Sequence, residues 1–163
     1  GEIIDTSSNA AVGEITDSNT PPHRIISDVG VTNAVLAELS RMESARLISH
    51  EERIGVDARM IARFFLSDVG KRALLSDEVH REWSFNLRLP EENGLIVQGV
   101  IDLCFVTDGA WELVDYKTDR VASADDLYPI YGEQLSLYRR ALEECTDKRV
   151  AHAELFALNA RAV

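Results

Sequence analysis

Hydrophobic and polar residues follow two different periods along the chain. Between residues 32 and 75, apolar side chains recur every three or four residues, as at Val35, Leu39 and Met42, which predicts helices with one buried face. Between residues 82 and 89, apolar and polar side chains alternate strictly, which predicts a half-buried strand. The pattern therefore indicates a helical first half and a sheet in the second half.

Local start and stop signals divide the first half into several helices. Thr20 and Pro21 are typical of a helix start, and Gly30 is expected to end that short helix. Ser49 and Glu52 have the spacing of a capping box. Residues 1–19 are polar and aperiodic, which predicts a flexible tail or a linker remnant. The expected helices cover residues 20–30, 32–47, 57–66 and 68–75.

The second half predicts a meander of three strands, followed by a helix and a last strand. Asp108 and Gly109 form a strong hairpin signal between the second and third strands. This order of elements predicts an α/β or α+β domain over residues 20–163. The expected strands cover residues 82–89, 95–106, 111–117 and 150–158, and the helix covers residues 132–144.

The second hairpin brings two aspartates together. If Asp108 and Gly109 are the central turn residues, the numbers of paired positions add up to 217, so Asp102 lies directly opposite Asp115. Lys117 is two residues beyond Asp115 and therefore shares its face of the sheet. Facing carboxylates repel, so a shared proton, the lysine or a bound cation must offset the repulsion. Carboxylate oxygens suit Mg²⁺ or Mn²⁺.

The first hairpin leaves two registers open for Glu82. With a five-residue loop over residues 90–94, Glu82 lies opposite Asp102. With a two-residue turn at Asn93 and Gly94, Glu82 points to the other face. Pro90 and the two glutamates after it favour the longer loop. A plain alternative for Asp115 and Lys117 is a solvated ion pair, but Asp102 interrupts an apolar run, where a carboxylate seldom lies without a partner.

Composition narrows the class of protein. The 163 residues are enough for one domain with a hydrophobic core, and no apolar run is long enough to span a membrane. Two cysteines without metal-type spacing indicate a reducing, cytoplasmic location. The net charge of −11 argues against a stand-alone nucleic-acid binder and predicts weak intrinsic affinity for DNA.

Three motifs in this order resemble those of RecB-like nucleases of the PD-(D/E)xK superfamily. A G-x-x-D motif ends at Asp102, a D-Y-K-T-D motif begins at Asp115, and a Q-x-x-x-Y motif joins Gln134 to Tyr138. The chain is most similar to the C-terminal nuclease domains of AddA/RexA-type helicase–nuclease subunits, over about residues 20–158. The resemblance implies a restriction-endonuclease-like core, with a central mixed sheet flanked by helices.

The resemblance also implies a metal centre. It implies that Asp102, Asp115, the backbone carbonyl of Tyr116 and His23 hold Mg²⁺ or Mn²⁺, and that Lys117 is the catalytic lysine. His23 corresponds to the histidine of a G-T-x-x-H helix start, although this chain has asparagine in place of the glycine.

Three further positions match the same family. Glu82 belongs to a segment similar to R-E-x-x-F and matches its active-site glutamate, which supports the longer first loop. Gln134 and Tyr138 match residues one helical turn apart that face the DNA backbone. Asp119 is expected to be a turn residue rather than a ligand.

The implied function is that of a metal-dependent DNA exonuclease domain acting on single-strand ends in double-strand break repair and recombination. The implied partners are DNA, the rest of a longer helicase chain and an AddB/RexB-type subunit. The chain lacks the iron–sulfur cysteines of some relatives and any Walker motif, so no cluster and no ATP site are expected in it. The alternatives are a catalytically silent, nuclease-like DNA-end-binding or scaffold module, and a sheet-edge domain for protein interaction.

Overall fold

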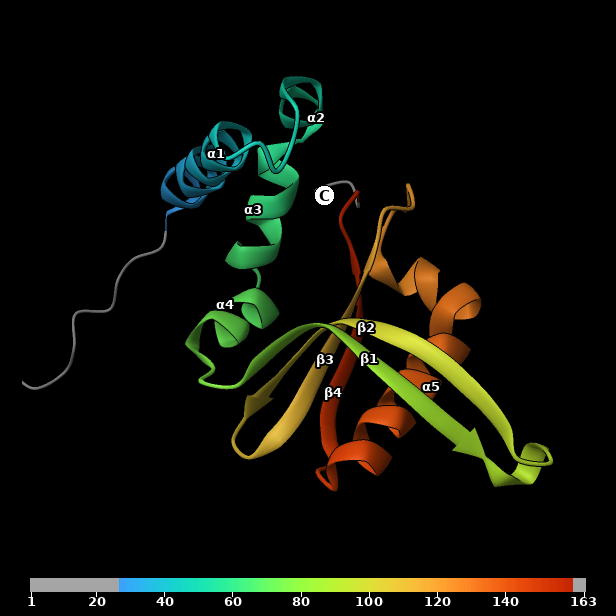
Figure 1. The fold of residues 1–163 in the computed structure, drawn as a ribbon. Helices are drawn as coiled ribbons and strands as arrows, with labels where there is room; N and C mark the ends of the chain where they lie inside the picture. The colour runs from blue at the N-terminus through green and yellow to red at the C-terminus, as the bar shows by residue number, and fades with distance from the viewer. Residues whose placement is uncertain (1–26, 160–163) are drawn as a thin grey trace, which may run out of the picture.

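A computed structural model of the protein describes residues 27–159, in which a helical N-terminal part precedes a four-stranded mixed sheet (Figure 1). This is the α/β architecture expected from the sequence, in the arrangement of the restriction-endonuclease-like core. The helices are α1 (Asp28–Ser44), α2 (His50–Gly55), α3 (Ala58–Leu66), α4 (Asp68–Leu75) and α5 (Tyr128–Thr146). The strands are β1 (Val79–Leu89), β2 (Leu95–Thr107), β3 (Ala110–Lys117) and β4 (Val150–Ala157), and short 3-10 helices cover Pro90–Glu92 and Ala124–Leu127.

Side-chain caps start the helices at the residues that the sequence indicated, with one exception. Ser49 and Glu52 form the expected capping box of α2, Asp57 caps α3 and Ser67 caps α4. The exception is Gly30, which was expected to end a helix. It lies in the first turn of α1 instead, where its backbone N–H donates to Ser27 Oγ at 3.1 Å. The expected helix start at Thr20 and the tail over residues 1–19 lie outside the described residues.

Both hairpins have the turns that set the predicted register. Asp108 and Gly109 have φ angles of 51° and 75°, as a two-residue hairpin turn requires, and Thr107 pairs with Ala110. Leu89 pairs with Leu95 across the five-residue loop, so the longer of the two loops considered from the sequence is confirmed. After the crossover through α5, β4 pairs with β3 in parallel and makes β3 an inner strand.

The sheet has a hydrophobic core on each face. On one face, Phe85, Leu87 and Cys104 pack with Leu135 and Leu142 of α5. On the other, Leu103, Phe105 and Val114 pack with Phe64 of α3 and Val69 of α4. Helix α1 packs mainly on α3 and lies away from the sheet in Figure 1. None of the helices within residues 27–159 is long and apolar enough to cross a bilayer.

Strands β1 and β2 exchange their faces at one shared position. Ile101 belongs to the core under α5, whereas Leu103, two residues later, belongs to the opposite core. In a regular strand these two side chains would share a face. Glu82, which lies between the paired residues Arg81 and Trp83 of β1, has a φ angle of 52°. This irregularity turns both strands over at Glu82 and Asp102, where irregular strand geometry can re-aim side chains next to a functional site.

The two thiols are expected to differ in reactivity. Burial raises the pKa of the Cys104 thiol to about 12, whereas Cys145 is exposed. Because the thiolate is the reactive form, the folded protein should react with one equivalent of Ellman's reagent at pH 8 and with two after denaturation. A Cys145→Ser variant should show no reaction while folded. Rapid reaction of two thiols in the folded protein would contradict the packing described for β2.

Candidate functional site

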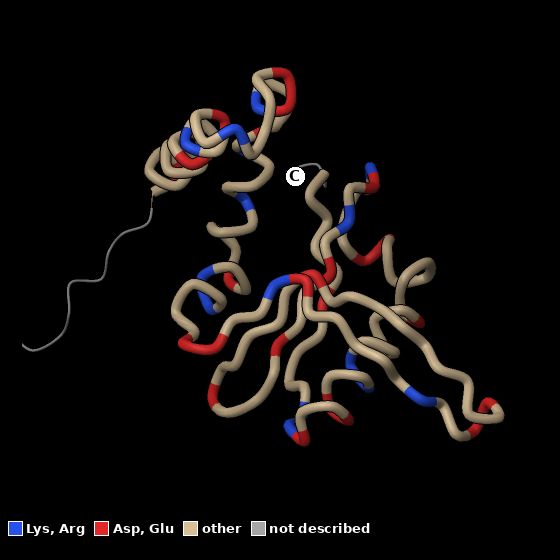
Figure 2. Tube along the Cα trace, in the orientation of Figure 1, with Lys and Arg blue, Asp and Glu red and all other residues tan. Residues whose placement is uncertain are grey.

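Two aspartates meet where β2 and β3 separate. The regular pairing of these strands, in the predicted register, ends at Leu103 and Val114. One residue further, the Asp102 Oδ2 atom accepts a hydrogen bond of 2.8 Å from the backbone N–H of Tyr116. Asp115 lies beside it on β3 and is only 3% exposed. Figure 2 shows acidic positions gathering where β1, β2 and β3 run side by side.

The Asp115 carboxyl group is held in an unfavourable setting for a negative charge. Burial raises its pKa, and the neighbouring Asp102 carboxylate raises it further, whereas Lys117 lowers it. The Lys117 Nζ atom lies 2.6 Å from Asp115 Oδ2, yet this buried oxygen accepts no aligned hydrogen bond among the described residues. The site therefore holds a buried carboxylate oxygen whose charge is only partly compensated.

Helix α5 supplies the other partners of Lys117. The Lys117 ammonium donates to Gln134 Oε1 at 3.0 Å, and Gln134 Nε2 donates to the Tyr138 hydroxyl at 2.9 Å. Burial, and then the Asp115 carboxylate, raise the pKa of Tyr138. The structure thus brings Gln134 and Tyr138 to the lysine. Their contact with DNA stays a prediction.

Tyr131 was not among the residues singled out from the sequence. Its ring centroid lies 4.2 Å from the Lys117 Nζ atom, and its hydroxyl group donates two long hydrogen bonds, of 3.3 and 3.4 Å, to the Asp119 carboxylate. The signal was present in the spacing, because Tyr131 precedes Gln134 by three residues and Tyr138 by seven. These intervals place all three on one helix face.

Two of the predicted site residues are not joined to the aspartates. Glu82 occupies the position opposite Asp102, as the longer loop requires, but its side chain is exposed. Within residues 27–159, no hydrogen bond connects Glu82 to Asp102 or Asp115. His23 lies outside the described residues, so its role as a ligand remains a prediction from the resemblance.

Gly99 lets two aromatic rings come close to the site. A Cβ atom at this position would lie 2.6 Å from Phe85 Cζ and 3.3 Å from Tyr138 Cε1. We expect Gly99→Ala to destabilise the fold by about 1–3 kcal/mol in urea unfolding, because the rings must move. Gly132→Ala is the matched control, since its Cβ atom meets nothing within 4 Å. Equal stability of the two variants would show that the rings yield freely.

Comparisons with known proteins give the family. The PD-(D/E)XK nuclease superfamily matches residues 11–162. This chain belongs to the PD-(D/E)XK nuclease superfamily. Its aspartate pair and Lys117 stand at the motif positions that resembled this superfamily in the sequence. The family resemblance expected from the motifs is therefore confirmed, whereas the roles of the individual residues stay predictions.

Curated relatives place this PD-(D/E)XK domain within larger proteins. It is 33% identical to an ATP-dependent helicase/nuclease subunit of Geobacillus thermodenitrificans over 147 residues, which are 78% of this chain and 12% of the relative. It is 32% identical to the subunit of the same name from Anoxybacillus flavithermus, over 88% of this chain and 13% of the relative. The chain thus spans about an eighth of the length of the curated relatives it matches.

Proposed function

We propose that this domain hydrolyses phosphodiester bonds of DNA with the help of a divalent metal ion, and that single-strand ends are its substrate. The observation that carries the proposal is the placement of Lys117 within 2.6 Å of the buried Asp115 carboxylate, next to Asp102. A nuclease fold supports it, because the chain matches a nuclease superfamily over nearly its whole length.

The donors at the site fit a hard divalent cation. Asp102, Asp115 and the backbone carbonyl of Tyr116 offer oxygen atoms, which Mg²⁺ and Mn²⁺ prefer. The buried Asp115 Oδ2 atom, which accepts no hydrogen bond, is suited to a cation. No group of three or more His, Cys, Asp or Glu side chains occurs within residues 27–159, so water, DNA phosphate or His23 would complete the shell. A bound divalent ion supplies an activated water and neutralises charge on the departing phosphate.

The remaining side chains bind, orient and move protons. The Lys117 ammonium, held by Gln134, is placed to donate a hydrogen bond to a phosphate oxygen and to stabilise its developing charge. Gln134 and Tyr138 would contact the DNA backbone from α5. Glu82, exposed beside the site, would accept a proton or help to hold a second ion.

The biological setting belongs to the same proposal. The curated relatives are named ATP-dependent helicase/nuclease subunits. We infer that this domain is part of such a helicase–nuclease, works in the cytoplasm with an AddB/RexB-type partner, and trims DNA during double-strand break repair. The net charge of −11 supports delivery of the strand by the helicase, since phosphate affinity comes from Lys and Arg.

The test is degradation of end-labelled single-stranded DNA by the domain in Mn²⁺, in Mg²⁺ and in EDTA. We expect degradation in both metals and none in EDTA, and loss of degradation in Lys117→Ala. Lys148→Ala is the matched control and should remain active, because Lys148 pairs with Glu78 rather than with Asp115. Binding of DNA ends without degradation, also after the helicase portion is restored, would instead support a silent end-binding module.

A further inference from the structure

We propose that Tyr131 is a positioning residue that holds the Lys117 ammonium against the face of its ring, ready for the nuclease reaction. This inference rests on the proposed function for its catalytic meaning, and on the structure for its geometry. It adds to the site a residue that lies outside the D-Y-K-T-D and Q-x-x-x-Y motifs.

Three groups surround the ammonium. Asp115 Oδ2 lies 2.6 Å from Nζ, Gln134 Oε1 lies 3.0 Å from it, and the centroid of the Tyr131 ring lies 4.2 Å from it. The Lys117 side chain is only 14% exposed. An ammonium over an aromatic face is attracted by the ring quadrupole, and the attraction strengthens where water is excluded.

The ring is itself fixed at both ends. Its hydroxyl group donates to Asp119, two residues beyond Lys117, and its body packs on the core between α5 and the sheet. Tyr131 also shares a helix face with Gln134, so α5 presents two neutral partners to the same ammonium. A rigid face gives the lysine one preferred place.

Neutral partners matter because Asp115 has two demands on its carboxylate. A cation bound there would compete with the ammonium for Oδ2, since both are positive. Gln134 and the Tyr131 ring keep their attraction for the ammonium whatever Asp115 binds. Tyr131 therefore keeps the lysine at the site when its carboxylate partner is engaged elsewhere.

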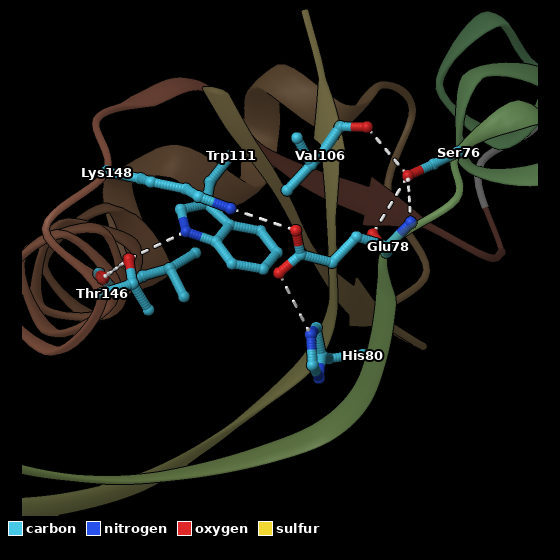
Figure 3. Close-up of polar contacts among 8 residues, drawn as sticks. Ser76, Glu78, His80, Val106, Trp111, Thr146 and Lys148 are labelled. Atoms are coloured by element: carbon cyan, nitrogen blue, oxygen red, sulfur yellow. Dashed lines mark hydrogen bonds and ion pairs between the residues drawn. The ribbon is translucent and has the colours of Figure 1, made fainter. Parts of the chain in front are cut away.

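The position of the ammonium can be measured without nuclease activity. The chain has three lysines, so protein grown with ¹³C-lysine gives three ε-methylene signals in a two-dimensional NMR spectrum. Protons over an aromatic face are shifted upfield. Lys148 lies over the Trp111 ring at 5.1 Å and is the shifted reference (Figure 3). Lys71, which pairs with Asp68 at the surface, is the unshifted reference.

Two substitutions separate the ring from its hydroxyl group. We expect the Lys117 signal to lie upfield in the wild type, to stay there in Tyr131→Phe, and to move toward that of Lys71 in Tyr131→Leu. We expect kcat for DNA degradation to fall about tenfold in Tyr131→Leu, with KM nearly unchanged, and Tyr131→Phe to restore it. Tyr128→Leu, on the exposed start of the same helix, is the matched control and should change neither quantity.

The outcomes are distinct. A Lys117 signal that is unchanged in folded Tyr131→Leu overturns the proposal, and so does full activity in a variant whose signal has moved. If the wild type degrades no DNA under any condition, the proposed function fails by itself. The NMR comparison then still decides whether Tyr131 holds the ammonium.

Discussion

Asp115→Asn is expected to lose about 1,000-fold or more in nuclease activity and also the stabilisation that divalent metal gives the folded domain. The substitution keeps the shape of a side chain that is buried on β3 but removes its charge. A ligand that binds only the folded state stabilises it by mass action, which amounts to about 1.4 kcal/mol at ten times its Kd. Urea unfolding of wild type and variant, with and without 10 mM Mg²⁺ or Mn²⁺, measures the difference.

Lys117→Ala separates the two effects of that substitution. This variant should lose activity like Asp115→Asn, yet it should keep the metal-dependent gain in stability, because both aspartates remain. It should bind metal at least as tightly as the wild type, since the ammonium no longer competes for Asp115 Oδ2. If Asp115→Asn kept the full metal-dependent gain, the aspartate pair would not be the metal site.

Arg72→Met is expected to destabilise the fold by about 3 kcal/mol, the lower end of the range for breaking a buried ion pair. The Arg72 guanidinium on α4 donates from Nε and Nη2 to the Glu112 carboxylate on β3 at 2.7–2.9 Å. The Glu112 side chain is 3% exposed, so its charge would remain buried without this partner, whereas Arg72 itself is 38% exposed. Urea unfolding at pH 7 measures the loss.

Two controls identify the cause of that loss. Lys71→Met changes the neighbouring residue of α4, whose pair with Asp68 is exposed, and should shift stability by less than about 0.5 kcal/mol. The double variant Arg72→Met with Glu112→Leu should recover most of the loss, because no unpaired charge remains buried. A double variant as unstable as Arg72→Met would show that packing, rather than the charge, accounts for the effect.

Much of the site could be predicted because it depends on local turn chemistry. Asp108 and Gly109 determine the register of the second hairpin, and the loop over residues 90–94 determines that of the first. Register alone then brings Asp102 beside Asp115 and puts Lys117 on the face that meets α5, since side chains alternate along a strand. The motifs added the superfamily, which the match over residues 11–162 confirms.

Local signals were less reliable where other residues could satisfy the backbone. Gly30 is a common helix terminator, yet the Ser27 side chain caps its N–H and α1 continues to Ser44. Helix α5 begins at Tyr128, four residues before its expected start, because Pro129 fits the first turn of a helix. In both places the sequence allowed two boundaries of similar energy.

The sequence by itself determined the order of the elements, the two hairpin registers and the aspartates and lysine that they place together. Only the tertiary structure decided which partners these groups meet. The exchange of faces at Glu82 and Asp102, the ring of Tyr131 over Lys117 and the pairing of Arg72 with Glu112 join residues that are up to 40 positions apart. Such contacts depend on how α4 and α5 pack against the two faces of the sheet, and no local pattern encodes that packing.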